Sequence, residues 1–269
     1  MRHDDKGIMQ VHISQALEKE KHCFLCHLEG TLEQRYVEVY LSELVMDPKA
    51  REKIVASRGF CNYHFYKMFV SATNPASEDC LGMALILKSV TGQLLEDVKD
   101  QRHMRFIATK SWKLDLKRSA GSIRNIKLSK PVSNEAECPA CDHISKMMRL
   151  YIEEFLDGII QNEEMWELYD KSKGMCMPHY VMTLYIANSI SNGKFEQTIK
   201  KLVEKQIQAL ERIQKDLSEY IEKQDYRFST SERARTEESV GRGLKQLVGK
   251  RGIEKTLAKI LRTRQTGFP

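Results

Sequence analysis

The chain has 269 residues, of which 41% are hydrophobic and 30% charged, and a net charge of +6, a composition that excludes a chain disordered throughout. Its most apolar stretch, Leu81–Val90, is short and contains Lys88, so we expect no transmembrane segment. Asp4, Asp5 and Lys6 stand where a secretory signal needs an apolar core, and we therefore expect a cytoplasmic protein.

Scarce glycine and proline, at 14 and 6 residues, and abundant Glu, Lys, Leu, Ile and Met predict an all-α protein. In chain order we expect a first helix from Cys23 to about Met46, a second over about Pro48 to Ser57, and a third from Cys61 past Phe69. A long packing helix should follow each half, because apolar residues recur at helical spacing: Met83, Leu87, Val90, Leu94 and Val98, then Ile199, Val203, Ile207, Leu210 and Leu217.

Six of the seven cysteines belong to a duplicated pattern. Two Cys-x2-Cys pairs are each followed, after 34 residues, by Cys-x2-His: first Cys23, Cys26, Cys61 and His64, then Cys138, Cys141, Cys176 and His179. The two sets coincide when the chain is shifted by 115 residues, which indicates an internal duplication.

The same shift superimposes residues with structural roles. Asp47 before a proline and Asn162 before two glutamates are helix N-cap signals. Gly59 and Gly174 stand where a short second helix would end. Each repeat therefore predicts helix, turn, short helix, glycine and helix, with each cysteine pair near a helix start, where amide groups and the helix dipole favour thiolate.

Three cysteines and one histidine per repeat are the ligands of closed structural zinc sites. We expect two Zn²⁺ sites, each joining the first and third helices of its own repeat. Four protein ligands leave no position for water or substrate, so the pattern favours a scaffold over a zinc enzyme. Cys61→Ser should then remove one metal and leave the second repeat folded, whereas ligands exchanged between the halves would let one substitution disturb both sites.

Two redox alternatives stay open at this stage. Iron–sulfur clusters use the same thiolates, and histidine can replace a cysteine ligand, so an electron-transfer protein is the main alternative. A redox dithiol at Cys138 and Cys141 is less favoured, because Phe-Leu separates the equivalent cysteines and no βαβ pattern surrounds either pair. Neither a phosphate-binding loop nor a Ser-His-Asp set is recognisable, which also favours a non-enzymatic protein.

Three histidines near the cysteine pairs are weighed as ligands and set aside, and one cysteine lies outside the repeated pattern. His22, His27 and His143 have no histidine at the shifted position and are expected to be solvated or to lie behind the ligands. Cys80, whose shifted position is Phe195, is expected to be a core thiol of a helix.

Positive charge is concentrated in two segments. Residues 110–130 carry +6, and residues 226–269 carry eleven basic and four acidic side chains. We therefore divide the chain into a first repeat (1–112), a basic linker (113–131), a second repeat (132–228) and a basic tail (229–269). Apolar residues at helical spacing predict two short amphipathic helices in the tail: Val240, Leu244, Leu247 and Val248, then Ile253, Leu257, Ile260 and Leu261.

The basic segments raise the question of a partner. The tail helices either dock on the helical bundle or present a basic face to nucleic acid, a membrane surface or an acidic protein. Charge alone motivates nucleic-acid binding, because neither an aromatic stacking platform nor a reading-helix motif accompanies it.

The paired motifs resemble a family of uncharacterised bacterial proteins. The resemblance rests on the two Cys-x2-Cys pairs, on Gly-Phe-Cys-Asn-Tyr-His64 and Gly-Met-Cys-Met-Pro-His179, and on Asp225-Tyr-Arg-Phe228 and Leu247-Val-Gly249. It covers most of the chain. It implies an all-helical, duplicated, cytoplasmic protein and leaves the function open.

Overall fold

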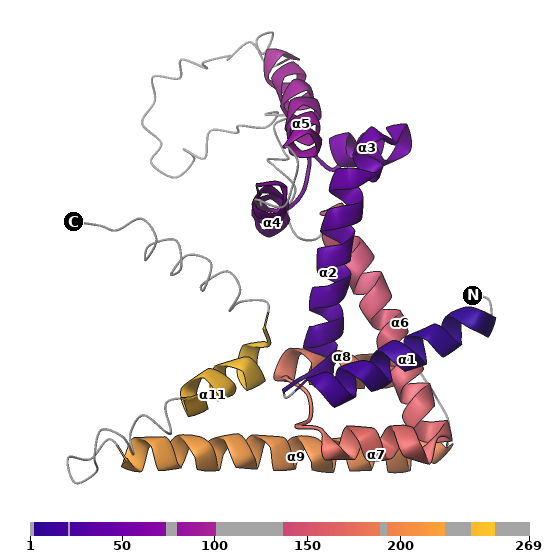
Figure 1. Cartoon of the computed structure of the whole chain (residues 1–269), viewed down its shortest axis with the longest axis vertical. Helices are drawn as coiled ribbons and strands as arrows, with labels where there is room; N and C mark the ends of the chain where they lie inside the picture. The colour runs from indigo at the N-terminus through magenta and orange to yellow at the C-terminus, as the bar shows by residue number, and fades with distance from the viewer. Residues whose placement is uncertain are drawn as a thin grey trace, which may run out of the picture. The chain divides into compact units, whose positions relative to one another are not determined.

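The computed structural model describes residues 3–20, 22–73, 80–100, 137–188, 193–223 and 238–250, and these contain helices and no strand (Figure 1). The helices are α1 (His3–Lys19), α2 (Phe24–Ser42), the 3-10 helix η1 (Leu44–Met46), α3 (Pro48–Ala56), α4 (Asn62–Ala72), α5 (Leu81–Asp100), α6 (Pro139–Gln161), α7 (Glu163–Lys171), α8 (Met177–Ala187), α9 (Gly193–Glu222) and α11 (Glu238–Val248). The all-α prediction is confirmed. None of the described helices is both long and apolar enough to cross a membrane.

The helix order of each repeat follows the sequence signals. The Asp47 carboxylate accepts a hydrogen bond from the Ala50 amide at 2.8 Å and caps α3, and Asn162 caps α7 through the Glu164 amide at 2.9 Å. Gly59 and Gly174 have φ of +96° and +88°. Because that conformation is costly for residues with a Cβ, glycine lets the chain reverse at both positions before the third helix of each repeat.

The chain forms two compact units, which we name unit 1 (residues 1–32 and 145–269) and unit 2 (residues 33–144). These bounds differ from those of the sequence repeats, because the chain passes from one unit to the other within α2 and again within α6. The expected linker and the second tail helix lie outside the described residues.

Unit 1 is built around an aromatic core. Phe24 from the start of α2 contacts Phe155 of α6 with ring centroids 4.8 Å apart, and Phe155 in turn contacts Tyr169 of α7 at 5.2 Å. The sequence signals did not include α1, which buries Ile13 and places His12 Nδ1 2.8 Å from the Tyr151 hydroxyl. These contacts hold the start of α2 against α6 and α7.

Unit 2 has an aromatic core of the same kind. Phe60 lies between Tyr40 of α2 and Phe65 of α4, with centroid distances of 5.3 and 5.7 Å. The Tyr40 hydroxyl also donates a hydrogen bond to the Ala50 carbonyl of α3 at 3.0 Å. The third helix of the first repeat is thereby fixed against the first.

The buried stripe of α9 differs from the expected one, whereas α5 buries Met83 and Val90 as expected. In α9 the buried positions include Leu202, Gln206 and Ala209, whereas Ile207 is 44% exposed. The Gln206 side-chain amide donates a hydrogen bond to the Met175 carbonyl at 3.0 Å. Hydrogen bonds to the backbone between α7 and α8 therefore set the rotation of α9 at this point, against the apolar periodicity.

The first tail helix, α11, lies along α9 (Figure 1). It turns a small and polar face inward, Ser239, Gly243 and Gln246, and leaves its apolar stripe about half exposed: Val240, Leu244, Leu247 and Val248. A Cβ on Gly243 would lie 3.3 Å from Leu217, so the close approach to α9 needs a small residue. The tail helix docks on its unit, but through its small and polar residues and not through the apolar stripe that its sequence suggested.

Candidate metal centres

Four helix starts supply the predicted ligands. Cys61 and Cys176 are the N-cap residues of α4 and α8, which places His64 and His179 in the first turn of these helices. Cys23 and Cys138 directly precede α2 and α6, and Cys26 and Cys141 lie in the first turns. Amide groups without a helical partner and the positive end of the helix dipole are found at each start, and both stabilise thiolate.

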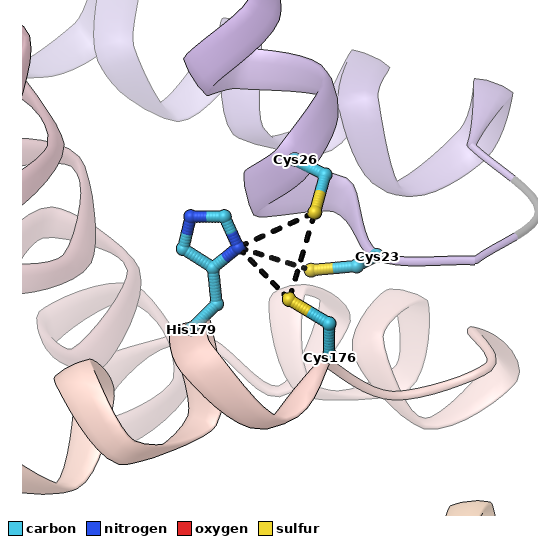
Figure 2. Close-up of side chains that lie close together, drawn as sticks. All are labelled: Cys23, Cys26, Cys176 and His179. Carbon is cyan, nitrogen blue, oxygen red and sulfur yellow. Dashed lines mark hydrogen bonds between the residues drawn. The ribbon is translucent and has the colours of Figure 1, made fainter. Parts of the chain in front are cut away.

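The first group of candidate ligands, which we name site A, consists of Cys23, Cys26, Cys176 and His179. Figure 2 shows the three sulfurs and the Nδ1 atom of His179 pointing toward one another from α2 and α8. Nδ1 lies 3.6, 3.4 and 3.2 Å from the sulfurs of Cys23, Cys26 and Cys176, and the sulfurs of Cys26 and Cys176 are 3.5 Å apart. All four residues are buried.

The second group, site B, consists of Cys61, His64, Cys138 and Cys141. Nδ1 of His64 lies 3.3, 3.6 and 3.4 Å from the sulfurs of Cys61, Cys138 and Cys141, and the sulfurs of Cys61 and Cys141 are 3.8 Å apart. The same nitrogen faces the sulfurs in both sites. Three of these residues are buried, and Cys141 is partly exposed.

The expectation that each repeat closes its own site is wrong. In both sites the Cys-x2-Cys pair of one repeat meets the Cys-x2-His pair of the other. Helix length explains this, because the 19 residues of α2 rise about 28 Å, whereas α3 can return only about 14 Å of that distance. The start of α4 is therefore remote from the start of α2 along its own repeat, and the exchange that we left open is the arrangement found.

A carboxylate lies behind the histidine of each site. Glu33 Oε1 is 3.1 Å from Nε2 of His64, and Glu29 Oε2 is 3.6 Å from Nε2 of His179. A carboxylate at this position fixes the ring and the tautomer of a histidine ligand and makes its other nitrogen a better donor. Both glutamates belong to α2, one helical turn apart, so the duplication did not supply them: the positions shifted by 115 are Ile144 and Met148.

Site B contains the more elaborate polar network. The Tyr63 hydroxyl donates a hydrogen bond to Glu33 at 2.7 Å, and the Lys67 ammonium pairs with the same carboxylate. Burial opposes the charge of Glu33, but hydrogen bonds from His64, Lys67 and Tyr63 outweigh it and lower its pKa to about 2. Glu33 is therefore an ionised carboxylate in the interior of unit 2.

The ligand groups themselves have perturbed acidities. A hydrogen bond from Cys138, opposed by burial and supported by His64, lowers the pKa of the Cys61 thiol to about 3, while the pKa of Cys138 is raised by the same sulfur pair and by burial. Burial opposes protonation of His179, yet its hydrogen bonds to the three sulfurs raise its pKa well above the usual value. Site B thus favours thiolate charge at Cys61, and the sulfurs of site A favour positive charge on the ring of His179; both arrangements suit a bound cation.

The end of α11 covers site A. A Cβ on Gly249 would lie 3.4 Å from the sulfur of Cys176 and 3.5 Å from that of Cys26, and φ of Gly249 is +74°. The Gln246 amide donates a hydrogen bond to the Met175 carbonyl at 2.6 Å, and Lys250 pairs with Glu20. The segment around Gly249 is thus anchored by one contact before this glycine and one after it.

Neither group contains the three histidines set aside as ligands or the remaining cysteine, Cys80. The ring of His143 contacts Tyr36 at a centroid distance of 5.1 Å, and His22 and His27 are partly exposed. Cys80 is exposed and donates to the Ala72 carbonyl at 3.3 Å, so the prediction of a core thiol was wrong. Sequence reasoning missed Glu29, Glu33 and Gly249, although the two glutamates at turn spacing after Cys26 were a signal that could have been found.

The fold and these groups define an all-helical protein with two buried sets of three cysteines and one histidine, each able to hold a metal ion. Residues 4–253 match the model of a family of unknown function, DUF6062, and the chain belongs to this family. No curated protein and no solved structure matches the chain.

Proposed function

We propose that this protein is a zinc-stabilised helical scaffold. One Zn²⁺ at site A and one at site B would each join a Cys-x2-Cys pair to a Cys-x2-His pair of the other repeat. The observation that carries the proposal is the convergence of three sulfurs and one nitrogen, all within 4.8 Å of one another, in each group.

The distances fit a single tetrahedral ion. Zinc bonds of about 2.3 Å to sulfur and about 2.0–2.1 Å to nitrogen place two sulfurs about 3.8 Å apart and a sulfur and a nitrogen about 3.5 Å apart. One Sγ···Sγ pair of each site is 3.5 or 3.8 Å apart, the other sulfur pairs lie within 4.8 Å, and the Sγ···Nδ1 distances are 3.2–3.6 Å. An iron–sulfur cluster places several iron atoms between its ligands and needs a wider opening. This spacing favours zinc.

The surroundings support a structural role for the ions. Four protein ligands complete a tetrahedron, and burial of seven of the eight ligands leaves little access for a substrate. Each ion would join helix starts that are far apart in the sequence, and such binding contributes directly to folding free energy.

Elemental analysis and a visible absorption spectrum test the proposal. The untagged protein is purified without oxygen and its concentration is determined by amino-acid analysis. Two equivalents of zinc and no visible absorption are expected. Iron with acid-labile sulfide and a brown chromophore would instead identify an electron-transfer protein. Less than one equivalent of any metal would reject both functions.

We further propose that the scaffold presents α11 and the basic tail to an acidic partner, of which nucleic acid is the testable case. The exposed apolar stripe of α11 supports a contact there, and the net charge of +7 in residues 226–269 supports an acidic one. Binding of mixed-sequence RNA and DNA is measured across a salt series. A steep decrease in affinity with salt is expected, and absent or salt-insensitive binding would reject the nucleic acid as partner.

A further inference from the structure

The six cysteines of sites A and B differ in exposure to solvent. Five belong to buried residues, whereas Cys141 of site B is partly exposed. Its counterpart under the shift of 115 residues is Cys26 of site A, which is 6% exposed and lies under Gly249. The two equivalent cysteines therefore have the same side-chain chemistry but differ in exposure to solvent.

We propose that Cys141 is a modification site, at which a hydroperoxide oxidises site B and releases its metal while site A keeps its own. The inference rests on the proposed function, because the released ion is the zinc of site B. Zinc-bound sulfur retains thiolate character, and thiolates that an oxidant can reach are the ones oxidised first.

The geometry supports a complete reaction within site B. The Cys141 sulfur attacks the outer oxygen of the hydroperoxide, the O–O bond breaks, and the sulfur becomes a sulfenic acid as an alcohol leaves. A second thiolate of the site then attacks this sulfur and forms a disulfide, and the sulfenic oxygen leaves as water after protonation. Two thiolates lose two electrons, and the hydroperoxide gains two electrons and two protons.

The second sulfur is close at hand. Cys61 Sγ lies 3.8 Å from Cys141 Sγ, and Cys138 Sγ lies within 4.8 Å of it. Either disulfide removes two of the four ligands from the ion, so zinc leaves as Zn²⁺. In site A the same reaction would first require the end of α11 to move away from Cys26 and Cys176.

The experiment uses the full-length chain loaded with two equivalents of zinc and treated with hydrogen peroxide. Released zinc is followed with a chromogenic chelator, and samples quenched with an alkylating reagent are analysed by mass spectrometry. One equivalent of zinc should be released at least ten times faster than the second. The fast phase should coincide with a disulfide that includes Cys141, and dithiothreitol with zinc should restore the metal content.

Two variants test whether access of the oxidant to the cysteines sets the rates of zinc release. Cys80→Ser removes the exposed thiol outside both sites and should leave the fast phase unchanged. Gln246→Ala with Lys250→Ala removes two contacts of the segment over site A and should accelerate the second equivalent without changing the first.

The outcomes distinguish the inference from the proposed function. If the chain does not bind two zinc ions at the start, the proposed function fails. If it binds two but releases them at one rate, or if Cys23, Cys26 and Cys176 are oxidised as early as Cys141, the inference is overturned while the scaffold stands. If the double variant still released its second zinc slowly, the inference would also be contradicted, because the segment over site A would then not be the cause of the difference in release rate.

Discussion

Sites A and B each contain three cysteines and one histidine that could hold a metal ion, but their surroundings differ. Site B has a buried glutamate at 3.1 Å from its histidine, supported by Tyr63 and Lys67, and one partly exposed cysteine. Site A has a glutamate at 3.6 Å whose side chain is 22% exposed, and the segment at Gly249 covers two of its sulfurs. The candidate ligands are thus the same in kind in both sites, whereas the residues that contact them differ.

The comparison shows which residues of such a centre recur in both repeats and which do not. Ligands at helix starts repeat with the sequence because the local backbone positions them. Supporting residues do not repeat: under the shift of 115 residues Tyr63 becomes Pro178 and Lys67 becomes Met182. The residues that support the candidate ligands therefore differ between two otherwise equivalent sites.

The largest expected effect concerns the pairing of the ligands. Cys23→Ser with Cys176→Ser removes two ligands of site A and should leave one zinc per chain. Cys23→Ser with Cys61→Ser removes one ligand from each site and should leave none. Elemental analysis of the purified variants measures both. The opposite pattern would show that each repeat closes its own site.

The loss of a site should also unfold the unit that contains it. A structural zinc contributes apparent binding energies of about 10–16 kcal/mol, which exceeds the stability of most small domains. We expected exchanged ligands to let one substitution disturb both sites, but all four candidate ligands of each site lie in one unit, so one substitution should affect one site. Hydrogen exchange with mass spectrometry should therefore show loss of protection in unit 1 for Cys176→Ser and in unit 2 for Cys61→Ser. Equal loss in both units for either variant would contradict independent sites.

The glycines before the third helices should differ in sensitivity. A Cβ on Gly59 would lie 2.4 Å from Cζ of Phe65, whereas one on Gly174 would lie 3.1 Å from Cβ of Ala209. Both residues also have positive φ. Gly59→Ala should cost about 3 kcal/mol of unfolding free energy and Gly174→Ala about 1–2 kcal/mol, measured by denaturant unfolding with zinc bound. A larger loss for Gly174→Ala would contradict the geometry.

The two glutamates should contribute unequally to metal affinity. Glu33→Gln weakens the closer and more buried carboxylate contact, so zinc at site B should bind about 10–100 times more weakly. Glu29→Gln should have a smaller effect on site A, because its contact is longer and more exposed. Competition with a chelator of known affinity measures both constants. Equal losses would show that the carboxylates do not distinguish the sites.

The helix caps should have the smallest and most similar effects. Asp47→Ala and Asn162→Ala each remove one capping hydrogen bond and should cost about 1 kcal/mol of unfolding free energy. Asp47→Asn retains an acceptor and serves as the control, with little change expected. Thermal unfolding of the zinc-loaded protein measures the series, and an Asn variant as unstable as the Ala variant would show that capping is not the cause.

Local signals predicted much of the fold. The N-caps at Asp47 and Asn162 and the glycines at 59 and 174 were expected at the places where the structure has them. The all-α class followed from composition and spacing. The buried face of α9 differs from its apolar stripe, because Gln206 donates a hydrogen bond to the Met175 carbonyl. A pattern of hydrophobic residues cannot predict such a polar contact with a distant segment.

The sequence by itself determined the eight candidate ligands, their local position at helix starts, and the duplication that relates them, because these depend on short-range spacing. Only the tertiary structure decided which ligands meet. In each repeat a long first helix separates the Cys-x2-Cys pair from the Cys-x2-His pair, and the short second helix cannot return that distance. Each Cys-x2-Cys pair therefore meets the Cys-x2-His pair of the other repeat. The tertiary structure likewise decided that Gly249 covers one site and that Glu33 supports the other, because both are contacts between elements that are distant in the sequence.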